Sequence, residues 1–165
     1  MSTTQKQKSG FTIVELLIVI VVIGILAAIT IVAYNGLQNR AKRSSVQSDV
    51  ANFAKVIEVA RLNTADGNYP LLPTASMGIK ADKSAYLTNR NNWYYCVSTD
   101  RTQYALGVVT DGGTGGAGFI TSPLTGLQER TGVDDASTCT VVSRPNGSNM
   151  GFNSTTSAWA AWVNG

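Results

Sequence analysis

An uninterrupted apolar run near the N-terminus constrains this chain more than any other feature. It reads LLIVIVVIGILAAITIVA from Leu16 to Ala33, with no charged residue and Thr30 as its polar interruption. As an α-helix rising about 1.5 Å per residue, some 20 apolar residues cross the roughly 30 Å hydrocarbon core of a bilayer. The alternative is a cleaved secretory signal peptide, whose apolar region holds only about 7–15 residues before a small-residue cleavage site. The sequence therefore predicts a retained membrane-spanning helix.

The composition of the remaining chain excludes several classes of function. Charged residues make up 14% of the sequence, against roughly 25% in an ordinary soluble domain. The net charge of +3 comes from 13 basic and 10 acidic residues without a long Lys/Arg field, which argues against an ordinary nucleic-acid-binding domain. The chain has no His, which excludes His-based acid–base catalysis and His metal ligation. We expect a protein that is not an enzyme and needs no cofactor or metal.

Glu15 places a single carboxylate at the edge of the apolar run. At membrane depth such a charge costs about 2–3 kcal/mol or more, and it marks a functional site by default. The alternative is that Glu15 merely reaches the head-group region from the start of the span. The surrounding residues favour the functional interpretation.

The run KSGFTIVELLIVIVVIGILAAITIVAYN, from Lys8 to Asn35, resembles the N-terminus of type IV pilin precursors and pseudopilins. That family has a short basic leader ending in Gly, then Phe, Thr, a Glu at the fifth mature position and a long apolar helix. The resemblance implies a leader over residues 1–10, with cleavage after Gly10 by a prepilin peptidase and methylation of the new N-terminal amine of Phe11. It covers about 30 residues, and the rest of the chain matches the family only in general layout.

In the filaments of this family, the fifth-position Glu pairs with the N-terminal amine of a neighbouring subunit. The resemblance therefore implies that Phe11 and Glu15 join copies of this chain. A charge buried in an apolar bundle needs such a partner, and one buried ion pair fixes a register that apolar contacts alone would leave free to slide. The partners implied are further copies of the chain, the membrane, the peptidase and a pilus assembly machinery.

One position departs from the family pattern. Many pilins carry Pro near the twenty-second mature position, which lets the helix melt locally in the filament, whereas this chain has Val32 there. Gly24 and Gly36 remain as weak points of the helix, because Gly is a poor helix former. The sequence leaves open whether the helix melts at either of them.

Charges on both sides of the apolar run leave its orientation undecided by the positive-inside rule. Lys6 and Lys8 precede the run, and Arg40, Lys42 and Arg43 follow it. The resemblance places the N-terminus in the cytoplasm, where the leader is cut, and the C-terminal part outside.

Two cysteines, Cys96 and Cys139, lie in that C-terminal part. An even number of cysteines suits a disulfide in an oxidising compartment, and two reduced core thiols are the alternative. A bridge closing a loop of about 44 residues would contribute up to about 4 kcal/mol in the chain-entropy model. A metal site is disfavoured, since the cysteines lack the paired spacing of zinc ligands.

Beyond Arg43 the apolar residues are confined to one face, with spacings of four, three and four. This stripe predicts an amphipathic continuation of the helix beneath a head domain; its members are Val46, Val50, Phe53 and Ile57. We expect one helix over residues 11–63, with its half at 11–34 in the membrane or filament core and its amphipathic half at 35–63. Gly67 and Pro70 should end it.

Residues 64–165 are predicted to form a β-rich head, which makes the fold α+β, with a long helix packed on a small antiparallel sheet. The runs NWYYCVST and QYALGVVT indicate a hairpin joined at Asp100 and Arg101, and further strands are expected at 118–121 and 138–143. Trp159 and Trp162 are expected to pack the C-terminus against the sheet.

Three weaker motifs in the head favour ordinary loops. The glycine stretch at 111–118 lacks the Lys and Ser/Thr of a P-loop. Asp111, Asp134 and Asp135 lack the spacing of a calcium loop, although some pseudopilins bind calcium. Asn146 and Asn153 begin short glycosylation patterns that arise easily by chance.

The resemblance thus implies the major subunit of a type IV pilus, membrane-bound as a precursor and then part of an extracellular filament for adhesion, twitching motility or DNA uptake. The alternatives are a pseudopilin of a type II secretion or competence system and a minor or tip pilin acting as a binding module. A basic, aromatic patch on the head would favour the last; its candidate residues are Arg90, Trp93 and Arg101.

Overall fold

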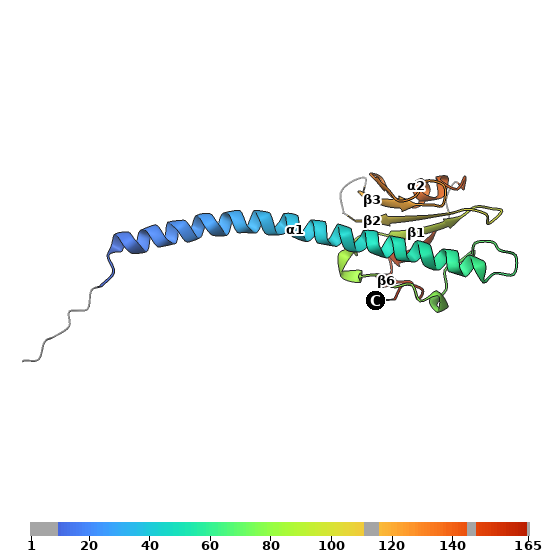
Figure 1. The fold of residues 1–165 in the computed structure, drawn as a ribbon, viewed down its shortest axis with the longest axis horizontal. Coiled ribbons are helices and arrows are strands. Elements are labelled where there is room, and N and C mark those ends of the chain that lie inside the picture. The colour runs from blue at the N-terminus through green and yellow to red at the C-terminus, as the bar shows by residue number, and fades with distance from the viewer. Residues whose placement is uncertain (1–9, 111–115, 145–147, 165) are drawn as a thin grey trace, which may run out of the picture. The chain divides into compact units, whose positions relative to one another are not determined.

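The computed structural model describes residues 10–110, 116–144 and 148–164, which belong to two compact units divided between Arg40 and Ala41 (Figure 1). Most of the expected leader, most of the glycine loop and the glycosylation pattern at Asn146 fall outside the described residues.

Helix α1 (Ile13–Leu62) is the one regular element among the described residues of the first unit and continues into the second. Its bounds agree closely with the single helix expected over 11–63. The helix continues through Gly24 and Gly36, where an added Cβ would meet no atom within 4 Å. Every residue of α1 up to Arg40 is exposed, and α1 is the one described helix long and apolar enough to cross a membrane.

The second unit contains an antiparallel sheet of six strands in the order β4-β3-β2-β1-β5-β6. Its strands are β1 (Asn92–Val97), β2 (Tyr104–Val109), β3 (Gly118–Thr121), β4 (Gln128–Arg130), β5 (Asn149–Asn153) and β6 (Ala158–Trp159). The predicted hairpin is β1–β2, with Tyr94 opposite Gly107, and the strand expected at 118–121 is β3. Strands β4, β5 and β6 were not predicted.

The C-terminal part of α1 packs on one face of this sheet, as predicted. Its buried residues are the four members of the expected stripe, Val46, Val50, Phe53 and Ile57. The Phe53 ring lies 5.2 Å from that of Trp93 and 5.4 Å from that of Trp162, measured between ring centroids. Each fully buried apolar side chain of this size stabilises the fold by about 1.5–3 kcal/mol. The head is therefore anchored on the helix.

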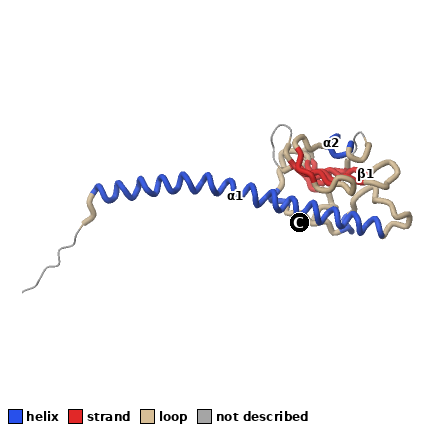
Figure 2. The backbone as a smooth tube through the Cα atoms, turned by 45° about the horizontal axis from the view of Figure 1, so that its top comes forward, coloured by secondary structure: helices blue, strands red, loops and turns tan. Residues whose placement is uncertain are grey.

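Strand β1 is buried on both faces because a second layer covers the other side of the sheet. Trp93 and Tyr95 join the core beneath α1, while the intervening Tyr94 joins a cluster on the opposite face. Successive side chains of a strand point to opposite faces, so a strand covered on both sides shows no polar alternation. Figure 2 shows the strands lying between α1 and the short helix α2 (Asp135–Thr140).

Helix α2 corrects the prediction of a strand at 138–143. Its β-branched residues suggest a strand, but Asp134 and Ser137 form a capping box that begins a helix instead. The Ser137 amide donates to the Asp134 carboxylate at 2.7 Å, and the Asp134 amide donates to the Ser137 hydroxyl at 2.8 Å. These two bonds satisfy amides that a helix start leaves unpaired.

A disulfide joins Cys96 of β1 to Cys139 of α2, with 5.2 Å between the two Cα atoms. It therefore ties the second layer to the centre of the sheet. Gly107 on β2 allows α2 to approach closely, because a Cβ at this position would collide with the buried side chain of Thr138.

The chain leaves α1 through the expected Gly67 turn, where φ is 67°. Tyr69 and Arg101 then hold this exit against the β1–β2 hairpin. The Tyr69 amide donates to the Arg101 carbonyl at 2.9 Å, and the Arg101 Nε donates to the Tyr69 carbonyl at 2.9 Å. Arg101 also pairs with Asp66 at 2.9 Å.

Candidate functional site

The start of helix α1 carries a reciprocal hydrogen-bonded pair, Thr12 and Glu15. The backbone amide of Thr12 donates to Glu15 Oε2 at 2.7 Å, and the Thr12 hydroxyl donates to the same oxygen at 2.8 Å. In return, the Glu15 amide donates to Thr12 Oγ1 at 3.2 Å. This is a capping box with Thr12 before the helix and Glu15 in its first turn. It satisfies backbone donors that would otherwise remain unpaired in an apolar surrounding.

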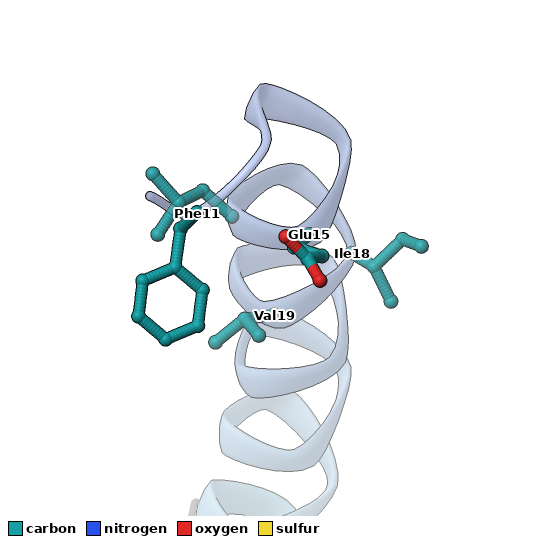
Figure 3. A pocket seen from close by; sticks show the side chains of 5 residues that line it. Phe11, Glu15, Ile18 and Val19 are labelled. Carbon is teal, nitrogen blue, oxygen red and sulfur yellow. The ribbon is translucent and has the colours of Figure 1, made fainter. Parts of the chain in front are cut away.

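Apolar side chains surround the Glu15 carboxylate. Phe11, Glu15, Leu16, Ile18 and Val19 line a shallow hollow on the helix surface (Figure 3). The Phe11 side chain is 85% exposed. Glu15 is exposed in the single chain, and its carboxylate would need hydrogen-bond donors or a positive charge once lipid or other helices covered this hollow, since an unpaired buried charge is very costly. Thr12 supplies two donors from the same chain, and the positive end of the helix dipole lies at the same place.

The structure brings together two of the residues singled out from the sequence, Phe11 and Glu15, in this hollow. It adds Thr12, which sequence reasoning had not assigned a role. The pattern Thr-x-x-Glu before an apolar run is a recognisable signature of a capping box, so the signal was present.

Gly10 precedes this site and is exposed, and an added Cβ there would meet no atom within 4 Å. No described contact of this chain therefore requires a small residue at position 10. Any requirement for glycine must come from another molecule that handles this segment.

Two of the acidic residues considered for calcium, Asp134 and Asp135, have other roles in the head, and Asp111 lies outside the described residues. Asp134 caps α2, and Asp135 accepts a hydrogen bond from the Ser148 amide at 2.7 Å. Asp135 lies with Cys96 and Cys139 in a group whose ligand atoms are within 4.8 Å of one another. The disulfide removes both sulfurs as thiolate ligands, so this group does not form a metal site.

The residues proposed for a basic, aromatic patch do not assemble into one. Trp93 is fully buried in the core beneath α1. Arg101 is engaged by Asp66 and by the Tyr69 carbonyl. The described part of the head therefore gives no support to a binding surface built on these residues.

A long helix with an apolar N-terminal part, continuing under an antiparallel sheet, is the architecture of a pilin-type protein. Residues 5–31 match the model of the prokaryotic N-terminal methylation motif. The chain is 40% identical over 60 residues to the type IV major fimbrial protein FimA of Dichelobacter nodosus, covering 36% of this chain and 38% of FimA. No solved structure gives a significant match.

The chain also resembles type II secretion system core protein G. It is 29% identical over 77 residues to that of Pseudomonas aeruginosa, covering 47% of this chain and 51% of the relative. With that of Klebsiella pneumoniae it is 31% identical over 81 residues, covering 49% and 54%. The chain thus matches about half or less of the length of these curated relatives.

The N-terminal part of the chain is that of a member of the type IV pilin and pseudopilin superfamily. The relatives are named as a fimbrial protein and as core proteins of a secretion system, which are structural proteins rather than enzymes. The methylation motif and the apolar helix support insertion of the precursor into a membrane.

Proposed function

We propose that this chain is the major subunit of a type IV pilus. It is inserted in the cytoplasmic membrane with its N-terminus inside, cut after Gly10 by a prepilin peptidase and methylated at Phe11. The mature chain then polymerises through α1 into a surface filament that serves adhesion, twitching motility or DNA uptake. The observation that carries this proposal is a capped, charge-bearing helix start within the methylation motif.

The exposure of α1 supports polymerisation through this helix. The chain itself covers none of the apolar side chains between Ile13 and Arg40. Such a surface must be covered by lipid while the subunit is in the membrane, and by other helices once it leaves. Within such a helical bundle, Glu15 needs a positively charged partner. The N-terminal amine of Phe11, which cleavage frees in a neighbouring copy, supplies one.

The proposal divides the chain into four functional segments. Residues 1–10 are the cleaved leader, 11–34 the membrane and filament-core half of the helix, 35–63 its amphipathic half, and 64–165 the head. Gly24 and Gly36 are the positions where the helix would yield during assembly, because neither stabilises helical backbone as alanine would.

Replacing the carboxylate tests the proposal. We expect Glu15→Ala to be inserted and cut normally, while the yield of sheared surface fibres falls at least about tenfold, because a lost buried partner costs several kcal/mol. Lys55→Ala, which removes an exposed charge from a later part of the same helix, is the matched control and should leave fibre yield nearly unchanged. Wild-type fibre yield from Glu15→Ala would contradict the proposed role.

A pseudopilin is the second candidate, because the matches to core protein G extend over 77 to 81 residues, compared with 60 for FimA. A pseudopilin would share the membrane insertion, cleavage and helical stacking. It would remain in the cell envelope, and its loss would block protein secretion without removing surface fibres. Locating the processed chain in sheared fibres or in the envelope therefore distinguishes the two candidates.

A further inference from the structure

Helix α1 carries three basic residues beyond its apolar run, Arg40, Lys42 and Arg43, and one of them is paired within the head. Arg43 is engaged within the head, where it pairs with Glu129 and lies over the Phe119 ring at 5.8 Å from the centroid. Arg40 and Lys42 are exposed. None of the ion pairs or cation–π contacts among the described residues involves either of them.

The charge around these two residues is uncompensated along the helix. No acidic residue occurs between Glu15 and Asp49, so Arg40 and Lys42 add two positive charges to a segment without a nearby carboxylate in sequence. An exposed cation on an ordinary soluble surface would need no explanation. These two lie six and eight residues beyond Tyr34, which ends a segment apolar enough to span a bilayer.

Their distance from the apolar run places both at the depth of lipid head groups. Leu37 is the last large apolar residue of the exposed run. With about 1.5 Å of rise per residue, Arg40 lies roughly 4.5 Å beyond Leu37 and roughly 9 Å beyond Tyr34, and Lys42 lies roughly 7.5 Å and roughly 12 Å beyond them. The head-group layer on each side of a bilayer is about 5–8 Å thick, and long basic side chains can bend back toward it. Tyr34 lies one turn before Leu37, as expected for an aromatic residue at the membrane interface.

The two side chains point to nearly opposite sides of the helix. Positions two residues apart differ by about 200° around a helix of 3.6 residues per turn. Side chains that diverge in this way cannot converge on one small anion. They suit a ligand that surrounds the helix on all sides, which is the arrangement of a lipid layer.

We propose that Arg40 and Lys42 bind anionic phospholipid head groups around α1 on the C-terminal side of its membrane span. The phosphate groups supply the missing negative charge, and the contacts hold the subunit at a fixed depth until it leaves the bilayer. This inference rests on the membrane stage of the proposed function and is independent of the kind of filament that follows.

The test uses the full chain reconstituted in phosphatidylcholine bilayers that contain a minority of phosphatidylglycerol. Spin-labelled forms of the two lipids report, by electron paramagnetic resonance, the preference of the chain for the anionic lipid. The variants are Arg40→Gln, Lys42→Gln and the double substitution. Lys55→Gln is the matched control, since Lys55 is exposed on the same helix about 20 Å beyond Lys42, more than twice a Debye length of about 8 Å.

We expect each of the two substitutions to lower the preference for phosphatidylglycerol by up to about fivefold at the contacted sites, and Lys55→Gln to leave it unchanged. The preference of the wild-type chain should also largely disappear in about 1 M salt, where the Debye length falls to roughly 3 Å. Lys6 and Lys8 are present in every variant, so their contribution cancels in the comparison.

Wild-type preference in the double variant, or an equal loss in Lys55→Gln, would overturn the lipid proposal. A double variant with wild-type lipid preference and lost fibre assembly would also overturn it and would assign the two cations to a neighbouring subunit. Release of the wild-type chain from membranes by alkaline carbonate would contradict membrane insertion itself. Failure of the lipid proposal and failure of the proposed membrane insertion therefore give different results.

Discussion

The hydroxyl of Thr12 and the carboxylate of Glu15 lie 2.8 Å apart and close a capping box at the first turn of α1. The carboxylate proposed to join neighbouring subunits is therefore already held by its own chain. Thr12, which directly follows Phe11 and its proposed free amine, keeps the Glu15 charge at the N-terminal end of the helix.

Removing the Thr12 hydroxyl should weaken this arrangement. We expect Thr12→Val, which is similar in shape, to reduce fibre yield, because Glu15 loses one donor and its own amide loses an acceptor, together about 1–2 kcal/mol. Thr12→Ser retains the hydroxyl and should restore most of the yield. The measurement is the amount of subunit in sheared fibres per processed subunit in the cell. Equal yields from Thr12→Val and Thr12→Ser would rule out a role for the hydroxyl.

A second prediction concerns Gly10, where the chain itself would tolerate a larger side chain. We expect Gly10→Val to leave an uncut, membrane-bound precursor, since a β-branched residue should not fit a peptidase site that accepts glycine. Gly36→Ala, which also meets no neighbouring atom, should be cut normally. The mass of the chain in the membrane fraction reports cleavage. Normal processing of Gly10→Val would mean that the cleavage site is misplaced.

Because α2 lies close to β2, a larger residue in place of Gly107 should destabilise the head. We expect Gly107→Ala to lower the free energy of unfolding by about 1–3 kcal/mol, because the added methyl group overpacks against Thr138. In the double variant with Thr138→Ala, part of the loss should be recovered, so the two effects should not add. Urea unfolding of residues 41–165, one compact unit, measures both. Strictly additive losses would show that the two side chains do not compete for space.

Buried tyrosines should make the head less stable at alkaline pH. Burial, with a 2.8 Å hydrogen bond from the hydroxyl to Glu58, raises the pKa of Tyr69 to about 12. Burial also raises the pKa of Tyr86, Tyr94, Tyr95 and Tyr104. An unfolded tyrosine ionises near pH 10, so the folded state binds protons more tightly above that pH.

The stabilisation from these groups is therefore complete below about pH 10 and decreases as the pH rises toward 12. Tyr69→Phe should make this decrease shallower. Urea unfolding at several alkaline pH values gives the slope. An unchanged slope in Tyr69→Phe would contradict the raised pKa.

The helix and the central hairpin could be predicted from the sequence because their signals are local. The stripe from Val46 to Ile57 repeats at helical spacing, and the two strands of the hairpin are adjacent in sequence. The signal for the Thr12–Glu15 capping box, Thr-x-x-Glu before an apolar run, is equally local, although sequence reasoning assigned Thr12 no role.

Other elements depend on distant partners or on competing local preferences. Strand β4 (Gln128–Arg130) is exposed and charged, and its pairing with β3 leaves no apolar pattern in the sequence. Strand β5 pairs with β1 across more than 50 residues, a relation that local patterns do not encode. At 138–143, β-branched residues favoured a strand, yet two capping hydrogen bonds from Asp134 and Ser137 determined a helix.

The intact mass of the chain recovered from fibres sheared off the cell surface tests the central claim most directly. We expect a mass that begins at Phe11, with one added methyl group and with Cys96 and Cys139 oxidised. Such a mass would establish a processed subunit within an external filament. An uncut chain found solely in the membrane would contradict the account and leave a single-span protein with an anchored head.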